Sequence, residues 1–93
     1  MNLVGCTKDE LKLHIESMFQ EGMTWDNMGE WHVDHIIPMN AFDLSCGEQQ
    51  RIVMWYKNLQ PLWGSENLKK SDKYEEEEKQ DLIYRYLSRA VSA

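Results

Sequence analysis

Two short segments of the chain have the character of β-strands, and they limit what it can fold into. The first is predicted over about residues 31–37 and ends at Pro38, because proline has no N–H to donate to a strand partner. The second is predicted over residues 59–63, where Pro61 places it at a sheet edge or a bulge. The other periodic stretches are helical. The sequence therefore predicts a small α+β domain with more helix than sheet.

Two capping boxes predict where the first helices begin. Thr7 is followed three residues later by Glu10, and apolar residues then recur at helical spacing, so a helix is predicted over about residues 7–20. The same pattern at residues 45–48 predicts a second, short helix that starts from a Ser45 cap. His14 falls on the apolar stripe of the first helix, where a structural histidine with a satisfied ring is the expected role.

Two further helices are predicted in the second half of the chain. Ser65 is a candidate cap for a helix that carries Asn67 and Lys70 on one face, because they are three residues apart. Four glutamates at residues 75–78 then lead into an acidic amphipathic helix, predicted over residues 74–93. The helix dipole would stabilise this acidic run if it lies in the first turn.

Composition bounds the class of protein. A chain of 93 residues that is 42% hydrophobic and has four tryptophans is expected to fold as one domain over residues 1–93. Cys6 and Cys46 stand alone, so neither a disulfide framework nor a four-cysteine zinc site is indicated. No apolar run is long enough to cross a bilayer and the start has no signal-peptide pattern, so a cytoplasmic protein without a membrane partner is expected.

The adjacent pair Asp34 and His35 carries the clearest chemical signal. A carboxylate beside an imidazole can hold a metal ion and activate water together. On a strand such a pair is, by itself, more often structural or exposed than catalytic. A downstream run over residues 58–72 adds two asparagines, Asn58 and Asn67, and a cluster of lysines. The pair and the run together make a catalytic site the stronger interpretation.

These two segments resemble the HNH endonucleases, in particular a group of phage and prophage HNH proteins. The resemblance covers about residues 4–73, with the core motif at residues 31–73. It implies a ββα-metal finger: a two-stranded antiparallel hairpin followed by a helix, here flanked by an N-terminal and a C-terminal helix. It also implies a metal-dependent enzyme that hydrolyses DNA phosphodiester bonds, of phage or prophage origin, in the cytoplasm of a bacterial host cell.

The resemblance assigns a role to four residues. His35 is implied as the general base, since an imidazole can take a proton from water near neutral pH. Asp34 and Asn67 are implied as ligands of one divalent metal ion, and Asn58 as the asparagine that fixes the loop bearing His35. Because both ligands are oxygen donors, Mg²⁺ is the expected metal, with Mn²⁺ or another transition metal as the alternative.

Strand geometry raises an objection to this arrangement. Successive residues of a regular strand point to opposite faces, so Asp34 and His35 would not share a site unless the strand is irregular there. An irregular strand is therefore expected. His32 lies on the face of Asp34 by the same alternation, and it is a candidate extra ligand or phosphate contact.

Candidate contacts to nucleic acid come from the lysines after the second strand. Lys70 is favoured as a phosphate contact because it shares the face of Asn67, and Lys69 and Lys73 are further candidates; a solvated helix face is the alternative for all three. The expected substrate is DNA, double-stranded, nicked or branched. The net charge of −6 argues against tight DNA binding, because proteins that grip phosphates are usually basic.

The acidic charge keeps two other functions open. One is an HNH-fold accessory or interaction module of a larger phage or DNA-processing assembly, with weak or no cleavage of its own. The other is a nuclease that a protein partner inhibits or recognises through the acidic C-terminal helix. Both assign a partner to the segment after Lys73.

Overall fold

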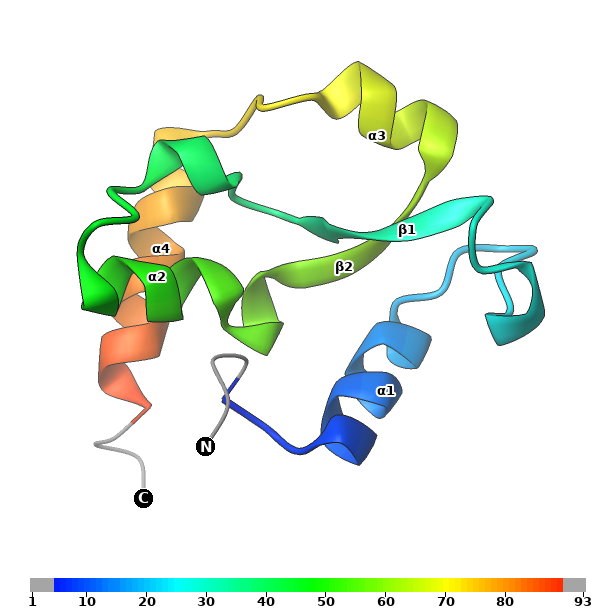
Figure 1. Cartoon of the computed structure of the whole chain (residues 1–93), viewed down its shortest axis with the longest axis horizontal. Coiled ribbons are helices and arrows are strands. Elements are labelled where there is room, and N and C mark those ends of the chain that lie inside the picture. Colours follow the sequence, from blue (N-terminus) through cyan, green and yellow to red (C-terminus); the bar gives the residue numbers. More distant parts are fainter. Residues whose placement is uncertain (1–4, 90–93) are drawn as a thin grey trace.

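The part of the protein that the structure describes is a small α+β domain with a two-stranded antiparallel hairpin and four α-helices (Figure 1). The computed structural model describes residues 5–89. The elements follow in the order α1 (Lys8–Ser17), β1 (Trp31–His35), α2 (Gly47–Met54), β2 (Leu59–Trp63), α3 (Gly64–Lys70) and α4 (Glu76–Ser88), with short 3₁₀ turns at Trp25–Asn27, Met39–Ala41 and Tyr56–Asn58. Within the described part of the chain, none of the helices has the length and apolar character that a membrane span requires.

The hairpin joins the two predicted strands. Strand β2 has the predicted bounds, whereas β1 ends at His35 and not at Ile37. The strands pair antiparallel, and Asp34 lies opposite Gln60 in the register. The chain leaves the regular strand after His35 because Ile37 N–H donates to the side chain of Asn58 and not to a backbone carbonyl. Pro61 is tolerated because each strand of a two-stranded sheet has an open edge.

The first helix begins as predicted and ends early. Thr7 Oγ1 accepts a hydrogen bond from the backbone N–H of Glu10, and the Glu10 carboxylate accepts one from the N–H of Thr7, which confirms the capping box. Helix α1 ends at Ser17. The ring of His14 lies 3.1 Å from the carbonyl oxygen of Leu59 and packs edge-on against Tyr56, as expected of a structural histidine.

The two serine caps predicted for later helices were wrong. Helix α2 begins at Gly47 without a side-chain cap, because Ser45 donates both its hydroxyl and its backbone N–H to the Asp43 carboxylate. Helix α3 begins at Gly64, directly after the strand, so Ser65 lies inside it. The last helix starts at Glu76, which places three glutamates in its first turn. The predicted end of this helix, beyond Arg89, lies outside the described residues.

Two apolar clusters hold the helices against opposite ends of the hairpin (Figure 1). The smaller cluster joins α1 to the strands and consists of Ile15, Met23, Trp31 and Leu59. The larger one joins α2 and α4 to the segment after β1 and consists of Ile37, Phe42, Ile52, Val53, Trp55, Leu82 and Tyr86. Helix α3 has no buried residue and packs on the two strands outside both clusters. The segment between Asp34 and Ile37 therefore crosses from one core to the other.

Ser71 carries backbone strain at the end of α3. Its φ of 48° and ψ of −123° lie in a region that residues with a Cβ rarely adopt. We expect Ser71→Gly to raise the free energy of unfolding by about 1 kcal/mol, measured by urea denaturation. Ser65→Gly, at a helical position of α3, is the matched control and should lower that free energy by up to ~1 kcal/mol. Equal effects of the two substitutions would contradict the expected strain relief.

Candidate functional site

Asp34 lies in a polar cluster built by three elements. Its carboxylate oxygen Oδ2 accepts a hydrogen bond from Gln60 Nε2 at 3.1 Å, across the hairpin. The same oxygen is 3.3 Å from the ammonium of Lys70, which comes from α3. The other oxygen, Oδ1, makes no hydrogen bond to the rest of the described chain. Oδ2 of Asp34 thus faces two donors, whereas Oδ1 is left for another ligand.

Lys70 connects Asp34 to the backbone of His35. Its ammonium donates a hydrogen bond of 2.9 Å to the carbonyl oxygen of His35, in addition to the contact with Asp34. The side chain of Lys70 is 20% exposed and that of Asp34 is 11% exposed, so the pair is poorly screened by solvent. The structure therefore places Lys70 against the Asp34 carboxylate and the His35 backbone, a contact that the sequence did not predict.

His35 is enclosed and has an unusual ring environment. Its Nε2 is buried and has no hydrogen-bond partner among the described residues. With Nε2 enclosed, Nδ1 is the ring atom left for contact with a water molecule. Burial lowers the pKa of His35 below its ordinary value; the Asp34 charge raises it, and Lys70 lowers it further. The ring is therefore neutral at neutral pH, the form that can accept a proton.

The irregularity predicted at Asp34 and His35 was wrong, because the chain leaves the regular strand only after His35. Asp34 and His35 both pair regularly, with Gln60 and Leu59 respectively. Their side chains accordingly leave the strand on opposite faces. What the two residues share is Lys70, which contacts the carboxylate of one and the carbonyl of the other.

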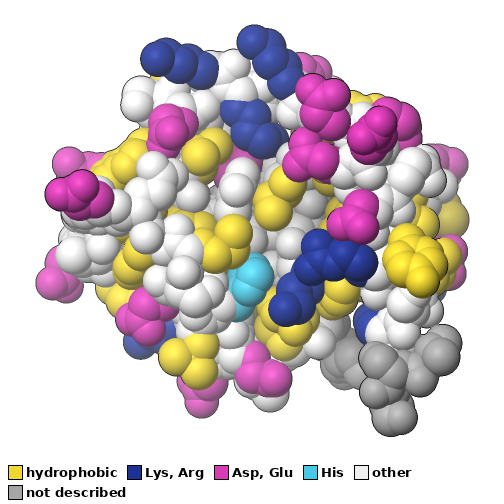
Figure 2. All heavy atoms as spheres, turned by 180° about the vertical axis from the view of Figure 1, so that it is seen from behind, with side chains coloured by type: hydrophobic (Ala, Val, Ile, Leu, Met, Phe, Trp, Pro, Cys, Tyr) yellow, Lys and Arg dark blue, Asp and Glu magenta, His cyan; other side chains and the backbone are white. Residues whose placement is uncertain are grey.

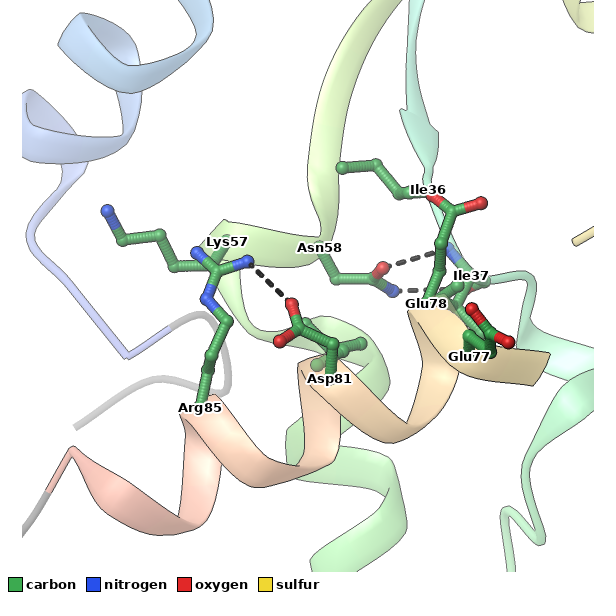
Figure 3. Close-up of a pocket in the computed structure, with 9 residues that line it drawn as sticks. Ile36, Ile37, Lys57, Asn58, Glu77, Glu78, Asp81 and Arg85 are labelled. Carbon is green, nitrogen blue, oxygen red and sulfur yellow. Dashed lines mark hydrogen bonds and ion pairs between the residues drawn. The ribbon is translucent and has the colours of Figure 1, made fainter. Parts of the chain in front are cut away.

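Asn58 is fully buried and holds the chain just after His35. Its Oδ1 accepts from Ile37 N–H at 2.8 Å, and its Nδ2 donates to the carbonyl oxygens of Ile37 and Val53, each at 3.0 Å. Its backbone carbonyl also accepts from Ile36 N–H at 2.8 Å. Figure 3 shows the two side-chain bonds between Asn58 and Ile37. The segment that follows His35 is thus fixed to the start of β2 at several points.

Asn67 lies one helical turn before Lys70 on α3. It is partly buried, and its side-chain amide makes no hydrogen bond to other described residues. Because residues three apart share a helix face, its amide projects from the side of α3 that carries Lys70. Its role as a metal ligand stays a prediction.

The remaining candidate contacts lie on the surface around α3. His32, Lys69 and Lys73 are exposed. The His32 ring lies near the start of α3, with Nε2 3.7 Å from where a Cβ on Gly64 would be. Figure 2 shows Lys and Arg side chains along the edge of the molecule where α3 lies, and Asp and Glu side chains over much of the remaining rim. A small basic edge therefore lies at α3, and a second group of Lys and Arg side chains lies near the centre of the same face (Figure 2).

The two side chains predicted as metal ligands, Asp34 and Asn67, both carry oxygen donors. No group of three His, Cys, Asp or Glu side chains converges within residues 5–89, which is what a zinc-type site would use. Asp34 offers Oδ1, and the amide oxygen of Asn67 is the second donor that the resemblance implies. Mg²⁺, which takes few protein ligands and several waters, is the metal expected for such oxygen donors, and the Lys70 ammonium lies 3.3 Å from the same carboxylate.

A pocket of about 340 Å³ lies beside the site, between α4 and the segment after His35 (Figure 3). Lys57 and Arg85 line it, together with three carboxylates of α4 from Glu77, Glu78 and Asp81. Arg85 and Asp81 form an ion pair at 3.7 Å. The walls thus carry both signs of charge, and sequence reasoning did not anticipate the pocket. Gln60 was also missed, although its position opposite Asp34 follows once the register is known.

The lowered pKa of His35 predicts a pH dependence of stability in the metal-free protein. A histidine with a depressed folded pKa stabilises the fold fully above its unfolded value, and this contribution is lost as pH falls through the folded value. We therefore expect the free energy of unfolding, measured with urea in EDTA, to fall between about pH 7 and pH 5.5 more steeply in wild type than in His35→Gln. Parallel pH curves for the two proteins would contradict this expectation.

Comparison with known proteins gives relatives but no described activity. The chain is 40% identical over 86 residues to one uncharacterized protein of Acanthamoeba polyphaga mimivirus, covering 89% of this chain and 38% of the relative. It is 45% identical over 60 residues to a second uncharacterized mimivirus protein, covering 63% of this chain and 26% of the relative. The chain thus spans well under half the length of either relative. No family model and no solved structure matches it.

Proposed function

We propose that this chain is a metal-dependent endonuclease of the HNH type that hydrolyses DNA phosphodiester bonds. The observation that carries the proposal is the convergence of the motif residues from distant parts of the sequence. Lys70 contacts the Asp34 carboxylate and the backbone carbonyl of His35, and Asn58 holds the segment directly after His35. A hairpin followed by a helix is the arrangement that a ββα-metal finger requires, and β1, β2 and α3 have that order. The assignment to that fold is part of the proposal.

In the proposed reaction His35 is the general base. Its neutral ring takes a proton from a water molecule, whose oxygen attacks phosphorus while the bond from phosphorus to the 3′ oxygen breaks. The departing 3′ oxygen takes a proton from solvent, so the products carry a 5′ phosphate and a 3′ hydroxyl. Asn58 keeps the His35 segment in place, and Lys70 supplies positive charge to the phosphate. A divalent cation held by Asp34 and Asn67 would neutralise charge on the phosphate and the leaving oxygen.

The acidic surface sets the conditions under which cleavage should be sought. At a net charge of −6, binding to DNA depends on the local basic edge at α3 and is weakened strongly by salt. Supercoiled plasmid incubated at low salt with wild-type protein should become nicked or linear with Mg²⁺ or Mn²⁺ and stay intact in EDTA. Intact plasmid with every divalent metal tested would overturn the proposal.

The acidic charge on α4 favours a second function, an accessory or interaction module of a DNA-processing assembly. Three glutamates in the first turn of α4 and the mixed charges of the adjacent pocket could contact a protein. Deletion after Lys73 is not a usable test of this function, because Leu82 and Tyr86 of α4 belong to the larger core. Capture of a specific partner by the intact chain, together with an intact plasmid, is the result that would favour the module.

A viral source is part of the proposal. Both relatives named above are mimivirus proteins. They support a viral origin of this chain, but they do not indicate a phage in particular. Action in the cytoplasm of the infected cell, the compartment expected from the sequence, likewise remains proposed.

A further inference from the structure

We propose that the Lys70 ammonium is the resident cation of Asp34 and that a divalent metal competes with it for this carboxylate. Metal binding would then release Lys70 from Asp34 and make it available to the substrate phosphate. The inference rests on the metal site of the proposed function, and it adds a coupling between metal binding and DNA binding.

The contacts of Lys70 show why it is a competitor. Its ammonium is held by two acceptors from adjacent residues, at 3.3 Å from Asp34 Oδ2 and 2.9 Å from the His35 carbonyl oxygen. Gln60 donates to the same oxygen at 3.1 Å. The Asp34 charge is therefore already compensated before any metal arrives. A divalent ion on this carboxylate would lie within a few ångströms of an ammonium, where their repulsion is little screened.

Release of Lys70 is sterically simple. Its side chain is a flexible four-carbon stem with three rotatable N–H donors, and it is 20% exposed at the edge of α3. Freed from Asp34, the ammonium can turn toward a phosphate without any movement of the helix. Lys70 would thus stabilise the Asp34–His35 pair in the metal-free protein and contact phosphate in the metal-bound one.

Because both would act on Lys70, the divalent metal and DNA are expected to bind cooperatively. If metal frees Lys70 for phosphate, DNA must raise the affinity for metal by the same factor, because binding linkage is reciprocal. A DNA phosphate that draws Lys70 away from Asp34 removes the cation that opposes the metal. The chain would then bind metal poorly alone and better on its substrate.

Isothermal titration of the metal-free, full-length protein with MnCl₂ tests the competition. Lys70→Met keeps the length of the stem but removes the charge, and we expect it to bind Mn²⁺ about three- to tenfold more tightly than wild type. Lys69→Met loses the same charge at an exposed position of α3, and its Mn²⁺ affinity should change by less than about twofold. Lys70→Arg keeps the cation and should bind Mn²⁺ no more tightly than wild type.

The results separate this inference from the proposed nuclease activity. Tighter Mn²⁺ binding by Lys70→Met supports the competition even if the wild-type protein leaves plasmid intact, which would overturn the nuclease alone. Equal or weaker Mn²⁺ binding by Lys70→Met, with native circular dichroism, overturns the competition even if the wild type cleaves. Absence of Mn²⁺ binding in both proteins also overturns it. If Lys70→Met does not fold, Lys70→Gln replaces it. A Lys70→Gln variant that binds Mn²⁺ no more tightly than wild type overturns the competition.

Discussion

Replacement of His35 by alanine is expected to slow plasmid cleavage by about 10²–10⁴-fold, the range typical of a lost general base. The buried and unpartnered Nε2 and the lowered pKa indicate that the ring is neutral at the pH of the assay. Without the imidazole, the attacking water would have to lose its proton to solvent. The expected loss is therefore in the rate constant of cleavage and not in affinity for DNA, which single-turnover kinetics at saturating protein would separate.

His32→Ala is the matched control for this experiment. His32 is three residues away on the same strand, but it is exposed and is at most an extra ligand or a contact to substrate. Its replacement should change the cleavage rate by no more than about tenfold. Similar rates for His35→Ala and wild type would exclude His35 as the base. Similar large losses for both variants would instead indicate damage to the hairpin, which circular dichroism can detect.

The helix starts show what the sequence could predict and what it could not. The Thr7 cap was predictable because its partner, Glu10, lies within the same helical turn. The Ser45 cap failed although its pattern was the same, because Asp43 lies two residues away and takes the hydroxyl. Local patterns do not indicate which of two nearby partners a short polar side chain will choose.

At the site, too, local features could be predicted from the sequence, whereas contacts between distant segments could not. Spacing alone predicted that Lys70 shares a face of α3 with Asn67, because helical geometry is local, but it did not predict that Lys70 contacts Asp34. The contact of Gln60 with Asp34 depends on strand register, which the hairpin sets over 26 residues of sequence separation. The burial of His35 Nε2 depends on tertiary packing. Neither could be derived from residue types.

Replacement of Asn58 is expected to have the largest effect on stability of any single substitution at the site. Its side chain is fully buried and makes three hydrogen bonds to backbone groups of Ile37 and Val53. Asn58→Ala leaves these groups buried without partners, so we expect a loss of about 3–5 kcal/mol in the free energy of unfolding. The total free energy of unfolding of a small domain is only about 5–15 kcal/mol. The variant should therefore be close to unfolding at room temperature. Urea denaturation gives the measurement.

Asn58→Asp provides a sharper test, because it keeps the acceptor for Ile37 N–H but replaces the donor to two carbonyl oxygens by a second acceptor. A buried carboxylate facing carbonyls has a raised pKa, so the folded state binds protons more readily than the unfolded state. The stability of Asn58→Asp relative to wild type must then increase as pH falls from about 7 toward 5, because the His35 contribution is present in both proteins and cancels in the difference. Asn40→Asp is the exposed control, with one side-chain bond to Asp72, and should cost less than ~1 kcal/mol. An Asn58→Asp protein as stable at neutral pH as this control would show that the amide does not hold the His35 segment.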